Sequence, residues 1–136
     1  MKPKAVIFDV GGVLLESPFV AALGWAQEWE IPLDALVTIF GDYSQTSAPD
    51  QSPMWHEVER GRVELEAFVL QMQKTLGGTL PLNHKAMTLT ASDFNPFAEG
   101  EPVVAMTKLV DEVRGRGVKT GILTNNVREW SAWREK

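Results

Sequence analysis

The sequence predicts an α/β fold in which parallel strands are joined through helices. This prediction is based on two observations. A short apolar run over residues 4–10 contains β-branched side chains and leads directly into Gly11 and Gly12, as a buried strand does where it enters a tight loop. Farther along, an amphipathic helix is expected over 102–114, followed by a second apolar run at 118–123. A strand, a helix and a second strand in this order are typical of a parallel crossover.

The segment between the two strands is expected to be mostly helical. Ser17 and Pro18 fit an N-cap followed by proline at the first helical position, so a helix is expected to continue from there through Trp29. Residues 42–53 are polar and contain several turn formers, which predicts a loop that acts as a lid or hinge. The other expected elements are helices over 34–40, 54–61 and 64–76, and a connection with one helical turn over 79–100.

Composition restricts the class of protein. A chain of 136 residues with 44% apolar side chains can bury one core with a small inserted lobe. The formal net charge is -5 and no Lys/Arg run is present, so neither nucleic acid nor a membrane is an expected partner. The absence of cysteine excludes disulfides, thiolate metal sites and thiol catalysis, and favours a cytoplasmic location. The apolar stretches are too short to span a bilayer.

Polar residues follow both predicted strands. Asp9 comes at the end of the first, before Gly11 and Gly12, and Thr124 and Asn125 follow the second. Open α/β sheets bind ligands beyond the carboxyl ends of their strands. A carboxylate there can attack phosphorus to form an aspartyl-phosphate, while glycine amides and a hydroxyl can donate to the phosphoryl oxygens.

These segments resemble a known family. Residues 7–14 (Ile-Phe-Asp-Val-Gly-Gly-Val-Leu) are similar to the first motif of haloacid dehalogenase-like (HAD) hydrolases, and 122–126 (Ile-Leu-Thr-Asn-Asn) to the second. Residues 55–68 look like the helical cap of the subgroup that inserts its cap after the first motif. The resemblance implies a Rossmann-like core over 1–15 and 100–136, and an inserted cap with its connections over 16–99.

The resemblance also implies roles for the polar residues. Asp9 would be the nucleophile and a Mg²⁺ ligand, and the Gly11 carbonyl would be a second ligand. Thr124 and the amides of Gly11 and Gly12 would hold the transferred phosphoryl group, and Asn125 would contact substrate or support the loop. The implied reaction is magnesium-dependent hydrolysis of a small phosphorylated metabolite, a phosphate monoester.

The sequence departs from the family at two places. Typical HAD phosphatases carry a second aspartate, the general acid and base, where this chain has Gly11. The lysine of the third motif and the acidic pair of the fourth are not recognisable, since the only acids after Thr124 are Glu129 and Glu135 and the only lysine is Lys136. We therefore expect the chain to hold the first part of a truncated core, with apolar surface covered by a missing C-terminal half or in an oligomer.

Two other functions fit the same residues. The first is a catalytically inactive fragment or binding module, which the unrecognised motifs favour. The second is a dehalogenase of the same superfamily, in which Asp9 would displace halide from carbon without magnesium. The run Thr124-Asn125-Asn126 could also serve only to cap a following helix.

Overall fold

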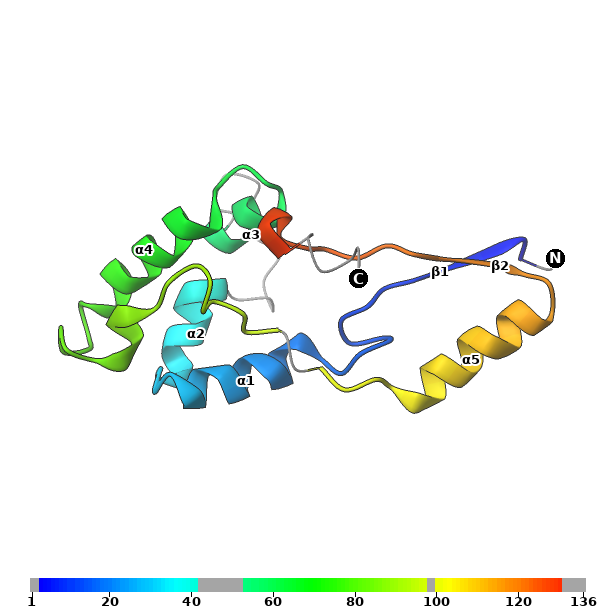
Figure 1. Cartoon of the computed structure of the whole chain (residues 1–136), viewed down its shortest axis with the longest axis horizontal. Helices are drawn as coiled ribbons and strands as arrows, with labels where there is room; N and C mark the ends of the chain where they lie inside the picture. Colours follow the sequence, from blue (N-terminus) through cyan, green and yellow to red (C-terminus); the bar gives the residue numbers. More distant parts are fainter. Residues whose placement is uncertain (1–2, 42–52, 98–99, 131–136) are drawn as a thin grey trace. The chain divides into compact units, whose positions relative to one another are not determined.

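The computed structural model describes residues 3–41, 53–97 and 100–130, and it is α/β, as predicted. Most of the predicted loop at 42–53 lies outside the described residues. Every predicted helix and strand is present, with bounds that differ from the expected ones by a few residues. In chain order, the described elements are β1 (Ala5–Phe8), α1 (Pro18–Glu28), α2 (Leu33–Phe40), α3 (Met54–Glu59), α4 (Leu65–Leu76), the 3₁₀ helix η2 (Lys85–Thr88), α5 (Val104–Gly115) and β2 (Lys119–Ile122) (Figure 1).

The chain divides into two compact units. Unit 1 comprises residues 1–24 and 96–125, and unit 2 comprises 25–95 and 126–136. The first boundary falls inside α1 and the last falls directly after Asn125. The sequence predicted a division after residue 15 and before residue 100. The assignment of the two units to a core and a cap remains a prediction.

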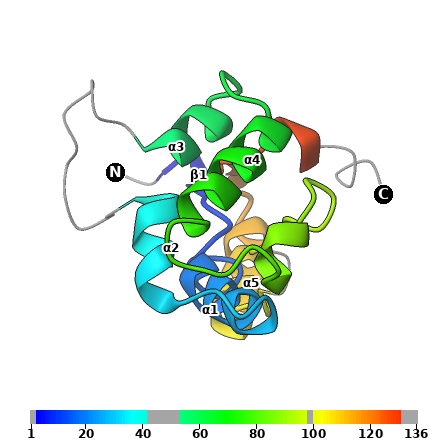
Figure 2. The ribbon, with the colours of Figure 1, turned by 90° about the vertical axis from the view of Figure 1, so that its left-hand side faces the viewer.

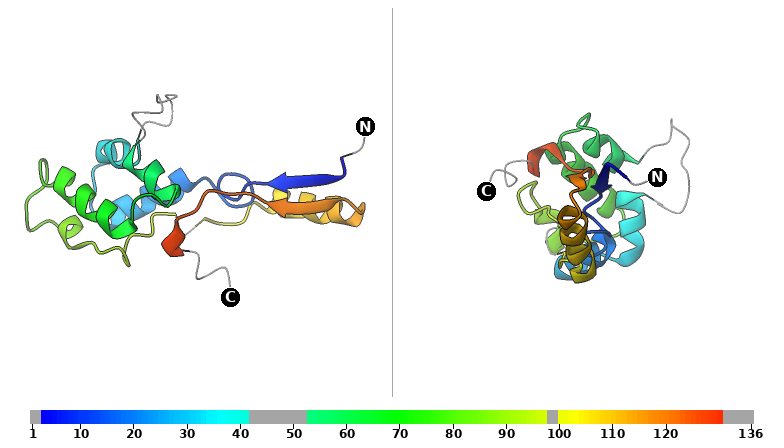
Figure 3. Two further views of the ribbon diagram at one scale, coloured as in Figure 1. Left: turned by 90° about the horizontal axis from the view of Figure 1, so that it is seen from above. Right: turned by 90° about the vertical axis from the view of Figure 1, so that its right-hand side faces the viewer.

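Unit 1 is built on the parallel pair β1 and β2, whose arrows lie side by side in Figure 3. The register pairs Ala5 with Lys119 and Phe8 with Ile122. The crossover helix α5 packs against β2, and Arg114 Nε of α5 donates a hydrogen bond to Thr120 Oγ1 of β2 at 3.0 Å. The predicted parallel crossover is therefore confirmed.

The prediction that the first strand is buried is met only at Phe8. Phe8 is buried, but Ile7 is 67% exposed, Ile122 66% and Leu123 72%. The sheet of the described residues has two strands, so β1 has a neighbour on one side only. Apolar runs of this kind are typical of strands that are covered on both faces, and here the second covering layer is absent from the part of the chain that the structure describes.

Unit 2 packs its helices around a cluster of aromatic side chains, and Figure 2 shows α2, α3 and α4 toward the viewer. Phe94 is fully buried, and its ring centroid lies 5.1 Å from that of Trp25 and 5.4 Å from that of Phe68. Trp55 meets Phe40 edge-on at 5.4 Å. Such edge-to-face pairs add about 0.5–1.5 kcal/mol each beyond the buried area.

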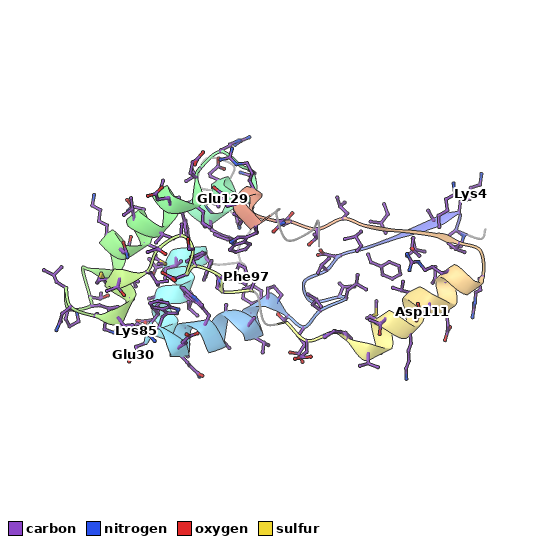
Figure 4. The ribbon with its side chains drawn as sticks, viewed as in Figure 1. Lys4, Glu30, Lys85, Phe97, Asp111 and Glu129 are labelled. Atoms are coloured by element: carbon purple, nitrogen blue, oxygen red, sulfur yellow. The ribbon has the colours of Figure 1, made fainter. Side chains whose placement is uncertain are left out.

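Side chains hold the irregular segment after α4 in place. The Gln73 amide Nε2 donates to the carbonyl oxygens of Met87 at 2.9 Å and Leu89 at 2.8 Å. Lys85 Nζ donates to the Glu28 carbonyl at 2.6 Å, near the end of α1, and lies 5.0 Å from the centre of the Trp29 ring. Figure 4 labels Lys85 close to Glu30. The predicted single helical turn of this segment is η2.

A short 3₁₀ turn at 128–130 joins the start of α4. Glu129 Oε1 accepts a hydrogen bond from the Leu65 N–H at 3.0 Å, and Glu129 is labelled beside α3 in Figure 4. Arg128 forms an ion pair with Glu64 at 2.6 Å. The first amides of a helix need acceptors from outside it, and Glu64 at the N-cap supplies none through its side chain. A residue 64 positions away supplies one instead.

Two glutamates of α3 have opposite electrostatic environments. Hydrogen bonds from Arg60 and then Arg62 lower the pKa of Glu57, which both arginines contact, at 2.6 and 3.2 Å respectively. Burial raises the pKa of Glu59, and this effect exceeds the opposing effects of His56 and of a hydrogen bond from the Trp55 side chain.

Among the described helices, none is long and apolar enough to span a membrane.

We expect Gln73→Leu to destabilise unit 2 by about 1–3 kcal/mol, because partly buried carbonyls lose their donor. Urea denaturation followed by tryptophan fluorescence measures this change. Gln71→Leu is the matched control, since Gln71 lies exposed on the same helix, and it should change the free energy of unfolding by less than about 0.5 kcal/mol. Equal effects of the two substitutions would contradict the bridging role of Gln73.

We expect Glu59→Gln to stabilise the protein at pH 7 relative to the parent chain, and to have no such effect at pH 3. A raised pKa in the folded state means that the stability contributed by Glu59 is present at low pH and is lost as the pH rises through that pKa. Glu57→Gln should do the opposite and destabilise at pH 7, because a lowered pKa contributes stability that is lost as the pH falls. Thermal denaturation across this pH range measures both effects. The assigned directions of the two pKa shifts would be wrong if the melting temperature at pH 7 changed in the same direction in both variants.

Candidate functional site

The pairing of β1 with β2 brings the predicted site residues to one edge of the sheet. Phe8 pairs with Ile122, and the Leu123 N–H donates to the Phe8 carbonyl at 3.0 Å. Continuing this register places Asp9 beside Leu123, one position before Thr124. Asp9, Thr124 and Asn125 are all exposed to solvent. All three residues therefore follow the carboxyl ends of the two strands and are open to solvent.

The turn after β1 is closed by one carbonyl. The Val10 oxygen accepts hydrogen bonds from the N–H groups of Val13 at 3.2 Å and of Leu14 and Leu15, both at 2.9 Å. Gly12 has φ +76°, a left-handed conformation that glycine adopts without the steric cost that a Cβ would bring. These residues therefore form a tight, backbone-defined loop directly after Asp9.

Two further hydrogen bonds fix this turn to the entry of α5. The Val103 N–H donates to the Leu14 carbonyl at 2.9 Å, and the Glu16 N–H donates to the Glu101 carbonyl at 2.8 Å. Sequence analysis did not predict this contact, because backbone hydrogen bonds between residues almost 90 positions apart leave no residue-specific pattern. The contact ties the turn that carries Asp9 to the crossover.

One oxygen of the predicted nucleophile is held locally. Asp9 Oδ1 accepts a hydrogen bond from the Val10 N–H at 2.7 Å. No hydrogen bond is found for Oδ2 in the described part of the chain. Asp9 therefore presents one oriented and one open carboxylate oxygen to solvent, an arrangement that permits attack on an electrophile.

The two predicted glycine amides differ. The Gly12 N–H donates to the Glu16 carbonyl at 3.2 Å and is therefore already engaged. The Gly11 N–H has no acceptor among residues 3–41, 53–97 and 100–130. Of the two, Gly11 is the one whose amide is available for a phosphoryl oxygen, whereas the contribution of Gly12 is to shape the turn.

Two residues after β2, the Thr124 side chain makes one weak local hydrogen bond in the described part of the chain. Its Oγ1 donates to the Asn125 carbonyl at 3.3 Å, a long bond between adjacent residues. Within the described ranges, the Thr124 side chain caps no helix. The hydroxyl can rotate toward a ligand at small cost, which suits the predicted role of donor to a phosphoryl oxygen.

The described residues do not by themselves form a magnesium site. Mg²⁺ takes six oxygen ligands in near-octahedral geometry, whereas the predicted ligands are one carboxylate, of Asp9, and one carbonyl, of Gly11. Within the described ranges, no group of three or more His, Cys, Asp or Glu residues is placed to hold a metal ion. Magnesium therefore remains a prediction from the family resemblance.

Comparison with known proteins gives two distant relatives, and no family model matches the chain. The chain is 29% identical over 127 residues to an acyl-CoA dehydrogenase family member 10 of Mus musculus, covering 90% of this chain and 11% of that protein. It is 31% identical over 125 residues to a sesquiterpene phosphatase of Aspergillus oryzae, covering 90% of this chain and 51% of that protein. The chain thus spans about half the length of one relative and about a tenth of the other.

We expect Thr124→Val to change the free energy of unfolding by less than about 0.5 kcal/mol, because the side chain is exposed and makes one long local hydrogen bond. If the hydroxyl holds the phosphoryl group, the same substitution should slow phosphate release about 10²–10³-fold, the usual cost of removing one such donor. Thr107→Val on α5 is the matched control, since Thr107 Oγ1 also donates to a nearby carbonyl, and it should leave the rate unchanged. Strong destabilisation with an unchanged rate would instead indicate a structural role for Thr124.

Proposed function

We propose that this chain carries the nucleophile of a HAD-like hydrolase of the phosphatase type, which acts on a small phosphorylated metabolite through an aspartyl-phosphate. The observation that supports the proposal is the parallel register of β1 with β2, because Asp9 and Thr124 then follow the carboxyl ends of neighbouring strands. In the proposal, unit 1 is the first part of a Rossmann-like core and unit 2 is the helical cap.

The proposed reaction uses three groups of unit 1. The open oxygen of Asp9 attacks phosphorus, and the bond from phosphorus to the leaving oxygen breaks on the opposite side. The Gly11 N–H and the Thr124 hydroxyl donate to the phosphoryl oxygens, where negative charge must be stabilised in the transition state. Water then attacks the aspartyl-phosphate, which releases inorganic phosphate and restores the Asp9 carboxylate.

The similarity to a phosphatase supports attack at phosphorus rather than at a carbon that bears halogen. The two relatives have names from different enzyme classes, and of the two only the sesquiterpene phosphatase is named as a hydrolase. The motif around Asp9 and the motif around Thr124 share no residues, and both favour the hydrolase class. Mg²⁺ enters the proposal as the cation that the family resemblance implies, and no step above depends on it.

A binding module without turnover is the second candidate. The small number of metal ligands among the described residues favours it, because a hard cation held by one carboxylate and one carbonyl is weakly bound and poorly oriented. Such a module would still bind a phosphoryl group through Gly11 and Thr124. Turnover that depends on Asp9 separates the two candidates.

We expect Asp9→Asn to reduce phosphate release from acetyl phosphate to the uncatalysed background while the fold is retained, because the substitution removes the nucleophile and preserves the side-chain shape. Phosphate release by the purified chain is measured with Mg²⁺ and with EDTA, because the family resemblance implies that the cation supports the reaction.

Asp34→Asn is the matched control for this experiment. Asp34 is an exposed aspartate whose Oδ1 accepts a hydrogen bond from the next N–H at 3.0 Å, the same local arrangement as at Asp9. The control variant should retain full activity. Equal turnover by the Asp9→Asn variant and the parent chain would remove Asp9 from the role of nucleophile, and no turnover by any variant would favour the binding module.

A further inference from the structure

We infer that the site acts on substrates whose leaving group departs as a stable anion, namely acyl phosphates and the terminal phosphate of diphosphates, in preference to alkyl phosphate monoesters. The inference rests on the proposed function and makes its substrate class more specific. It follows from the groups that surround Asp9 in unit 1.

The leaving oxygen determines whether the reaction needs an acid. When Asp9 attacks phosphorus, the electron pair of the broken P–O bond stays on the leaving oxygen. An alkoxide, whose conjugate acid has a pKa far above neutral pH like that of water, must be protonated as it leaves. A carboxylate with a pKa of about 4, or a phosphate with a second pKa of about 6, leaves as an anion and needs no proton.

The turn after β1 supplies no proton donor for an alkoxide. Between Asp9 and Glu16 the chain has only glycine and aliphatic side chains. At the end of β2, Thr124 and Asn125 offer an alcohol and an amide, which are far too weakly acidic to act as general acids near pH 7. A positioned general acid typically contributes about 10²–10⁴-fold, and alkyl phosphates would lose that factor at this site.

The acids that follow this turn do not replace the missing group. Glu16 and Glu101 are joined through their backbones, and both residues are exposed to solvent. Among the described residues no hydrogen bond positions either side chain at this turn, and a general acid contributes only when it is positioned at the reacting group. Within the described part of unit 1, the other carboxyl groups besides that of Asp9 are those of Asp111 and Glu112, which lie toward the C-terminal end of α5.

The backbone does not require glycine at position 11. Gly12 has a positive φ, but Gly11 does not. A Cβ built on Gly11 would meet the ring carbons Cδ and Cγ of Pro18 at 3.4 Å, which is ordinary van der Waals contact. The backbone therefore permits a side chain at position 11, and an acidic residue can be introduced there as a test.

The experiment compares leaving groups on the purified 136-residue chain. Asp9-dependent phosphate release, taken as the rate of the parent chain minus that of Asp9→Asn, is measured with acetyl phosphate, methyl diphosphate and butyl phosphate. We expect the first two to react at least about 10²-fold faster than butyl phosphate. In ¹⁸O-labelled water the acetate released should carry no label, because the bond to phosphorus is the one that breaks.

Two variants at position 11 complete the test. Gly11→Asp should raise the butyl phosphate rate selectively, about 10²–10⁴-fold, whereas Gly11→Asn, which has a similar shape and no acidic proton, should not raise it. Glu16→Gln should leave all three rates unchanged. A gain that is equal for the aspartate and asparagine variants would overturn the inference, because it would show that an acid is not what the site lacks.

The outcomes separate this inference from the proposed function. Butyl phosphate turnover as fast as that of acetyl phosphate in the parent chain would overturn the inference and leave the function standing. If no substrate shows Asp9-dependent release, the proposed function fails and the inference fails with it. Asp9-dependent chloride release from 2-chloropropionate would overturn both, because the electrophile would then be carbon.

Discussion

Parallel pairing of β1 with β2 is the interaction on which the candidate site depends. Because the two strands run in the same direction, their carboxyl ends meet at one edge of the sheet, and the register Phe8 with Ile122 means that Asp9 and Thr124 both follow that edge. A slip by one residue would turn each side chain to the other face and would change which residues meet at this edge. The crossover through α5, with its bond from Arg114 to Thr120, maintains this pairing.

The turn after β1 contains two glycines, and the fold requires only one of them. Its shape comes from backbone hydrogen bonds to the Val10 carbonyl and from the left-handed conformation of Gly12. Neither the hydrogen bonds to Val10 nor the left-handed conformation requires glycine at position 11. The Gly11 N–H has no acceptor among the described residues, and position 11 carries no acidic side chain. The two adjacent glycines therefore differ: Gly12 adopts a backbone conformation that favours glycine, whereas Gly11 has a conformation open to other residues.

Unit 2 is stabilised by contacts of a different kind. Its helices surround rings such as Phe94 and Trp55, and its last described residues bind α4 through Glu129 and Leu65. The chain passes from unit 1 to unit 2 directly after Asn125, one residue beyond Thr124. The segment that carries the predicted phosphoryl donor thus continues at once into residues held by the helices of unit 2.

Local sequence patterns determined most of the secondary structure and the identity of the candidate site residues. Apolar runs, helical spacing and the Ser17-Pro18 start are properties of neighbouring residues, so they could be recognised without the fold, and Asp9 and Thr124 were identified because polar residues directly follow such runs. Only the tertiary structure decided four other features. They are the strand register, the hydrogen bond from the Gly12 amide to the Glu16 carbonyl, the hydrogen bond from the Leu65 amide to Glu129, and the exposure of Ile7. The hydrogen bonds and the register depend on backbone groups and on residues distant in sequence, and the exposure of a side chain depends on which surfaces are covered by other elements. The pattern of a single segment contains neither kind of information.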